Sequence, residues 1–193
     1  MRTFPLTSIH TLVMTRPHTT CLIHGLLSAV IAAGCGAVLL NVFPQLEAGV
    51  FMGGAARLAS GLAGVPTMRT DEGWALLFSG QPLMVTTACS ATDFFLMTVA
   101  LLGWHFAQRL RPALLPCAAA GALVVAVPLT FFINALRLIA VAQAHHWVIP
   151  RLPPAYDSFL HMLTGAVVFL TALIALNLLL EFYGRSRTPH ARN

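Results

Sequence analysis

Three side chains in this sequence could carry chemistry, and they stand far apart along an apolar chain. Cys89 precedes Ser90-Ala91-Thr92-Asp93, a string that matches the capping box of a helix N-terminus. The partial positive charge at a helix N-terminus favours the thiolate, which is the nucleophilic form of cysteine. The alternative interpretation of Cys89 is a small apolar residue at a helix start.

Arg137 is the second candidate, because it lies within the apolar string that runs from Phe131 to Val141. A guanidinium near the middle of a membrane costs about 2.5–3.5 kcal/mol on insertion scales, and less at the interface. Asn134 lies three residues earlier and therefore shares a helix face with Arg137. Arg137 either binds a substrate carbonyl or oxyanion, or extends to lipid phosphates.

His161 is the third candidate, as an acid/base for the thiol. Asp157 and Ser158 precede it as caps of the last helix, and Asp157 could also orient the imidazole. The alternative for His161 is a hydrogen-bonded packing residue. The string His145-His146-Trp147 is typical of an interfacial belt, and a metal site formed by these histidines lacks supporting carboxylate or cysteine spacing.

The amino-acid composition indicates whether these residues lie in a soluble protein or in a membrane protein. Of 193 residues, 58% are hydrophobic and 9% are charged, whereas soluble domains carry about a quarter charged residues. This excludes an ordinary soluble enzyme, a disordered chain and a nucleic-acid binder. It predicts an all-α polytopic membrane bundle that forms one domain over residues 1–193. The four cysteines form no C-x-x-C pair, which argues against a structural zinc site or a thioredoxin-like pair.

The apolar runs predict the elements that position the candidates. Four spans are expected, at about 21–40, 92–108, 112–132 and 158–180, with an interfacial helix at about 133–147. The alternatives for 112–147 are one long helix, with Pro128 as a kink point, or two spans broken near Pro128. A cleaved signal peptide is the rival interpretation of the first run.

Residues 41–88 contain no clean span. Residues 47–64 fit an amphipathic or re-entrant helix, and residues 74–87 fit a hairpin or extended segment at the interface. This region separates the first span from the cysteine.

The arginines predict the orientation. Four spans place both termini and the 109–111 turn on one side, together with seven of the eleven arginines: Arg2, Arg16, Arg109, Arg111, Arg185, Arg187 and Arg192. The positive-inside tendency makes this side cytoplasmic, in the inner membrane. Cys89, Arg137 and His161 then lie at one level, at the outer face.

Three short motifs resemble the exosortase/archaeosortase family of membrane-embedded cysteine transpeptidases. Ala88-Cys89-Ser90-Ala91-Thr92 is similar to its nucleophile segment, Asn134 to Leu138 to its N-x-x-R-[I/L] segment, and His161 to Gly165 to its histidine with a glycine four residues later. Ala91 stands where the family usually has glycine. The chain is also shorter than typical members, which indicates a compact subtype with fewer N-terminal spans.

The resemblance implies an enzyme that cleaves the C-terminal sorting signals of exported proteins, whose transmembrane segment docks against the bundle. It assigns Cys89 as nucleophile, His161 as acid/base and Arg137 as oxyanion stabiliser, with Ser90, Asn134 and Asp157 in supporting roles. A thioester acyl-enzyme is implied, with no metal or organic cofactor and no nucleic-acid partner.

Two alternatives stay open. A non-enzymatic membrane assembly subunit would not need the three candidates to converge. A membrane thiol oxidoreductase would need a second cysteine close to Cys89.

Overall fold

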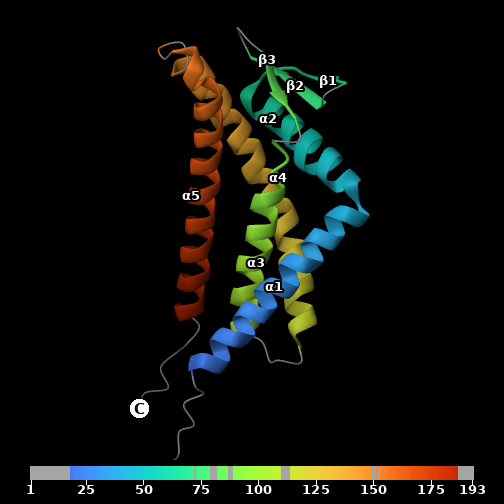
Figure 1. Ribbon diagram of the computed structural model, residues 1–193, viewed down its shortest axis with the longest axis vertical. Coiled ribbons are helices and arrows are strands. Elements are labelled where there is room, and N and C mark those ends of the chain that lie inside the picture. The colour runs from blue at the N-terminus through green and yellow to red at the C-terminus, as the bar shows by residue number, and fades with distance from the viewer. Residues whose placement is uncertain are drawn as a thin grey trace, which may run out of the picture.

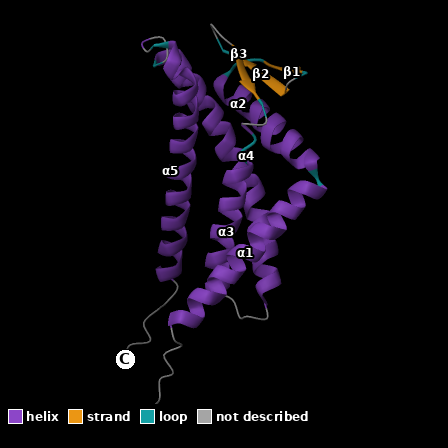
Figure 2. Cartoon of the chain, in the orientation of Figure 1, coloured by secondary structure: helices purple, strands orange, loops and turns teal. Residues whose placement is uncertain are grey.

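The protein is a bundle of long helices that carries a small helix-and-sheet unit at one end (Figure 1). The computed structural model describes residues 18–71, 73–78, 82–86, 89–109, 114–148, 151 and 153–186. Helices make up most of this chain and the strands occupy only one corner (Figure 2). The predicted all-α membrane class is therefore confirmed.

Four long helices form the bundle: α1 (His18–Val42), α3 (Thr92–Arg109), α4 (Leu115–Trp147) and α5 (Asp157–Ser186). Three described stretches are long and apolar enough to cross a membrane, namely Leu22–Val42, Leu115–Trp147 and Ser158–Gly184. Helix α3 is more polar, with Asp93 in its first turn and Arg109 in its last. Its 18 residues extend about 27 Å, close to the hydrocarbon thickness of about 30 Å. The fourth span thus stays a prediction, with α3 as its candidate.

Helix α4 differs from the expected arrangement, because no break separates residues 112–132 from an interfacial helix at 133–147. It continues as one helix of 33 residues with Pro128 inside it. Neither glycine nor proline occurs between Pro128 and Trp147, and apolar residues, with alanine and leucine the commonest, fill most of that stretch. At about 50 Å, α4 is longer than the hydrocarbon is thick, so part of it extends beyond the membrane.

Small residues let α1 and α3 approach closely. A Cβ atom at Gly103 would lie 2.8 Å from the Cβ of Ala32, and the Ser28 hydroxyl donates a hydrogen bond to the Gly103 carbonyl at 3.0 Å. Contacts of this kind replace the hydrophobic driving force that is missing between helices in lipid.

Helix α5 presents much of its surface outward, yet polar side chains attach its C-terminal half to α3. His105 Nε2 lies 2.9 Å from Asn177 Oδ1, and the Asn177 amide donates to Glu181 at 2.9 Å. Arg109 donates to the Leu180 carbonyl. These bonds fix the helix whose opposite end carries His161.

The helix-and-sheet unit consists of the π-helical segment η1 (Leu46–Gly54), α2 (Ala55–Ala63) and three strands: β1 (Thr67–Thr70), β2 (Gly73–Leu77) and β3 (Pro82–Val85). The strands form an antiparallel sheet in the order β1-β2-β3. The expected helix over 47–64 thus corresponds to η1 and α2, and the expected extended segment over 74–87 belongs to this sheet.

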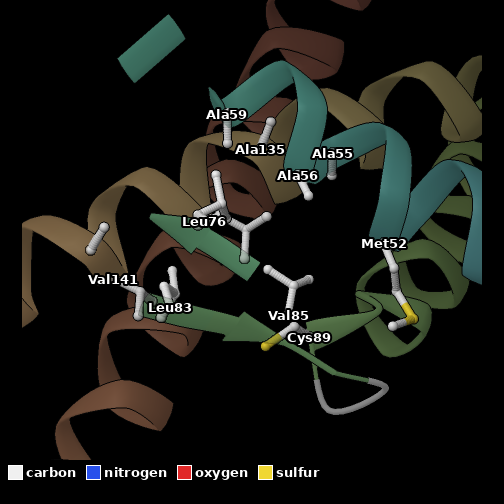
Figure 3. Close-up of a cluster of buried hydrophobic side chains, with 12 residues drawn as sticks. Met52, Ala55, Ala56, Ala59, Leu76, Leu83, Val85, Cys89, Ala135 and Val141 are labelled. Carbon is white, nitrogen blue, oxygen red and sulfur yellow. The ribbon is translucent and has the colours of Figure 1, made fainter. Parts of the chain in front are cut away.

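The core of this unit lies between the sheet, α2 and the upper half of α4. Leu76 and Val85 from the sheet, Ala59 from α2 and Leu138 from α4 are all buried there. Cys89 belongs to the same cluster, directly below Val85 (Figure 3). The unit therefore covers the cysteine with apolar side chains.

Candidate active site

Cys89 lies in the connection between β3 and α3, and backbone and side-chain hydrogen bonds hold its main chain. Its N–H donates to the Thr86 carbonyl at 2.8 Å. The buried Asn134 amide donates to the Cys89 carbonyl at 2.9 Å and to the Phe51 carbonyl at 2.7 Å. The side chain of Cys89 is 3% exposed. Asn134 thus attaches the cysteine backbone and η1 to α4.

The turn after Cys89 contains a strained residue. Ala91 has φ +60°, in the left-handed region, and its carbonyl accepts the first helical hydrogen bond of α3 from Phe95 at 2.9 Å. The Ser90 hydroxyl accepts the Thr92 N–H at 3.4 Å, whereas a capping box would engage Asp93. Glycine adopts this conformation at no steric cost, whereas alanine is strained there.

A chain of polar groups continues from Ser90 to the helix-and-sheet unit. The Ser90 and Thr92 hydroxyl oxygens are 2.9 Å apart, and Thr92 donates to the Glu47 carboxylate at 3.0 Å. Glu47 is half-buried in η1. Sequence reasoning did not single it out, although a lone carboxylate in an apolar stretch is a signal for function in membrane proteins.

The thiol of Cys89 contacts the imidazole of His161. The distance from Cys89 Sγ to His161 Nε2 is 3.8 Å, across 72 residues of sequence. His161 lies in the second turn of α5 and is half-buried. This geometry suits proton transfer from sulfur to nitrogen, which would generate a thiolate paired with an imidazolium.

Arg137 lies on the same side of α4 as Asn134 and is 7% exposed. Its guanidinium carbon lies 4.9 Å from the centre of the Phe169 ring. Its Nε is buried and has no hydrogen-bond partner among the described residues. A buried cation therefore lies at the same cavity as Ser90, the residue that follows the cysteine.

Gly165 makes room for this cation. A Cβ atom at Gly165 would lie 2.5 Å from Arg137 Nε and 3.0 Å from its Nη2. Gly165 follows His161 by four residues, which is about one helical turn. On neighbouring turns of α5, His161 therefore contacts the sulfur of Cys89 and Gly165 leaves space for the guanidinium of Arg137.

A cavity of about 530 Å³ opens beside these groups. Its polar lining comes from Glu47, Ser90, Thr92, Asp93 and Arg137. Apolar side chains of α5, among them Met162, Phe169, Leu170 and Leu173, form much of the rest. The cavity therefore combines one arginine and two carboxylates with apolar walls, next to the turn that follows the cysteine.

Most of the predicted site residues meet at this end of the bundle. Cys89 and His161 are in contact, Asn134 holds the cysteine loop, and Ser90 and Arg137 line the cavity. Asp157 opens α5, and its side chain lies outside the described residues. The catalytic roles of these residues stay predictions.

The two neighbouring histidines separate in the structure. His146 is exposed, with its ring centre 4.8 Å from that of Trp147, as an interfacial residue would be. His145 instead reaches His161, with 3.4 Å between His145 Nε2 and His161 Nδ1. Within the described part of the chain, no group of three or more His, Cys, Asp or Glu side chains could hold a metal ion.

A signal for His145 was present in the sequence. It follows Asn134 by eleven residues, close to three full helical turns, so the two share a face of α4. The spacing places His145 on the face of Asn134 only if one helix continues from Phe132 to His145, and the sequence left that continuity open.

Fold and site together define an integral membrane protein that holds a cysteine–histidine pair next to a buried arginine. The family described as transmembrane exosortase matches residues 7–178. The chain therefore belongs to the transmembrane exosortase family, and the resemblance based on the three motifs is confirmed. No curated protein and no solved structure matches the chain.

Replacing Ala91 by glycine tests the strained turn. Ala91→Gly should raise the free energy of unfolding by up to about 1 kcal/mol, because a left-handed conformation costs an L residue about 1–2 kcal/mol and glycine loses part of this gain to chain entropy. Unfolding in mixed detergent micelles measures the change. The matched control is Ala119→Gly inside α4, which should lower stability by a similar amount. A lower stability for Ala91→Gly would contradict the assignment of strain.

Proposed function

We propose that this exosortase is a cysteine peptidase and transpeptidase that acts through a thioester. Family membership supports a membrane protease or transpeptidase role in general. The observation that carries the finer assignment is the 3.8 Å distance between Cys89 Sγ and His161 Nε2. A thiol next to an imidazole is the usual arrangement of an activated cysteine nucleophile.

The reaction begins when His161 Nε2 takes the thiol proton of Cys89. The thiolate attacks the carbonyl carbon of the scissile peptide, so that a carbon–sulfur bond forms and the carbonyl oxygen becomes an oxyanion. Arg137, which lines the cavity, stabilises this oxyanion with its positive charge. His161 then protonates the departing amine as the carbon–nitrogen bond breaks, which leaves a thioester on Cys89.

The second half of the reaction releases the acyl group. An acceptor nucleophile, or water in the hydrolytic case, gives a proton to His161 and attacks the thioester carbonyl. The carbon–sulfur bond breaks, and the sulfur recovers its proton from the imidazolium. Within the protein, all proton transfers use the side chains of Cys89 and His161.

The substrates are exported proteins whose C-terminal sorting signal includes a transmembrane segment. The cavity lined by Ser90 and Arg137 supports this assignment, because its apolar α5 lining suits a peptide that enters from the lipid phase. The active site faces outward, and both termini are cytoplasmic. In Figure 1 the start of α1 and the end of α5 lie at the end of the bundle opposite the sheet. Arg109 lies at that end too, whereas Arg2, Arg16, Arg111, Arg187 and Arg192 lie outside the described residues.

The alternative functions fit the geometry less well. A non-enzymatic assembly subunit does not require a cysteine–histidine contact between distant segments. A thiol oxidoreductase requires a second thiol near Cys89, but Cys35 and Cys117 are exposed on α1 and near the start of α4. Twenty residues of α4, about 30 Å, separate Cys117 from Arg137.

Removal of the nucleophile is the first test of this function. Cys89→Ala should reduce processing by at least about 10³-fold, because it removes the thiolate that forms the acyl-enzyme. The measurement is mass spectrometry of the C-termini of exported proteins with a C-terminal transmembrane segment, in cells that carry only the variant. Cys117→Ala is the matched control and should process normally. Wild-type processing by Cys89→Ala at equal membrane abundance would refute the proposal.

The contact between Gly165 and Arg137 gives a second test. Gly165→Ala should reduce processing about 10²-fold, because the added methyl group displaces the guanidinium that stabilises the oxyanion. Gly184→Ala is a close control, because Gly184 lies on α5 like Gly165 but at the opposite end from the site. A Cβ atom at Gly184 would lie 2.8 Å from Nη2 of Arg109, an arginine of α3. Equal activity of the two variants would show that Arg137 has no part in the reaction.

A further inference from the structure

We propose that His145 is a positioning residue that fixes the tautomer and orientation of His161, so that the site works as a Cys89–His161–His145 relay. The inference rests on the proposed function and adds to it a residue outside the three family motifs. It follows from one contact, the 3.4 Å between His145 Nε2 and His161 Nδ1.

The two ring nitrogens of His161 have different neighbours. Nε2 lies 3.8 Å from the sulfur of Cys89, and Nδ1 lies 3.4 Å from His145. Nε2 can accept the thiol proton only if it carries no proton of its own, so the proton of neutral His161 must be on Nδ1. A group opposite Nδ1 therefore has to accept a hydrogen bond.

His145 can supply that acceptor. With its own proton on Nδ1, His145 offers the Nε2 lone pair to the Nδ1–H of His161. The two ring centres are 5.7 Å apart and the ring planes are inclined by 77°. The orienting group of a triad-type site acts in this way, by selecting the tautomer and holding the ring.

A neutral imidazole suits this location better than a carboxylate. Arg137 is already a buried cation beside the thiol, and proton transfer adds a thiolate and an imidazolium. Both histidines are half-buried, and another fixed charge between them would carry a desolvation cost that offsets its attraction to His161. His145 orients His161 without adding a charge in the resting site.

The position of His145 on α4 links it to the rest of the site. Asn134, which holds the cysteine backbone, and Arg137, which supplies the cation, lie on the same helix. One rigid helix thus fixes the loop that carries the sulfur, the guanidinium and, through His145, the imidazole. His146 is exposed and serves as an internal control.

The test uses iodoacetamide, which reports on the thiolate of Cys89 without any need for a substrate. The full chain is prepared with Cys21, Cys35 and Cys117 replaced by alanine, and the alkylation rate of Cys89 at neutral pH is read from peptide masses. His161→Ala and His145→Ala should each slow alkylation about tenfold or more. His145→Gln should recover most of the rate, because an amide oxygen can accept the same hydrogen bond, and His146→Ala should match the parent.

The pattern of rates separates the two levels of the proposal. If His161→Ala does not slow alkylation, the cysteine–histidine pair of the proposed function fails. If His161→Ala slows alkylation but His145→Ala does not, the pair stands and the role of His145 is refuted. A loss in Asp157→Asn without a loss in His145→Ala would identify Asp157 as the orienting group instead.

A second readout applies if the buried thiol excludes the reagent in every variant. Nitrogen-15 spectra of histidine-labelled protein report which ring nitrogen of His161 carries the proton. The parent should show protonated Nδ1, and His145→Ala should shift His161 toward the Nε2-protonated form, with recovery in His145→Gln. An unchanged His161 spectrum in His145→Ala would overturn the proposal, since a role in packing alone does not select a tautomer.

Discussion

The buried amide of Asn134 is the contact on which the arrangement of the site depends. It donates to the carbonyls of Cys89 and Phe51, and so joins the cysteine loop, η1 and α4 at one point. The loop has little regular structure of its own, so the position of the sulfur depends on this amide and on the apolar cluster that covers it. Buried carbonyls left without donors would destabilise this region by about 1–3 kcal/mol each.

Helices α4 and α5 position the other side chains of the site. Helix α4 supplies Asn134 and Arg137, and α5 brings His161 and Gly165 to the same place from successive turns. The lower half of α5 is attached to α3 through His105 and its partners, away from the site. The upper half of α5 can therefore border a cavity and still present its imidazole accurately. The strain at Ala91 is of the kind that proteins accumulate at functional turns.

Composition and hydropathy were sufficient to predict the membrane class, and the order of three motifs was sufficient to predict the family. The helix boundary expected near residue 133 is absent, because the residues after Pro128 favour helix and continue α4. The full three-stranded sheet, the Thr92–Glu47 hydrogen bond and the contact between His145 and His161 were not predicted. Their positions depend on pairings between distant segments, such as the 45 residues between Glu47 and Thr92, which local patterns do not encode.

The central claim is that the sulfur of Cys89 becomes acylated by substrate. The most direct measurement is isolation of the protein from cells that are exporting substrates, under acidic denaturing conditions that preserve thioesters, followed by mass spectrometry of the peptide that contains Cys89. The account predicts an adduct on Cys89 whose mass equals the C-terminal peptide of a processed exported protein, and predicts that hydroxylamine removes it. Processing that continues while Cys89 never carries such an adduct, even when acceptor transfer is slowed, would contradict the account.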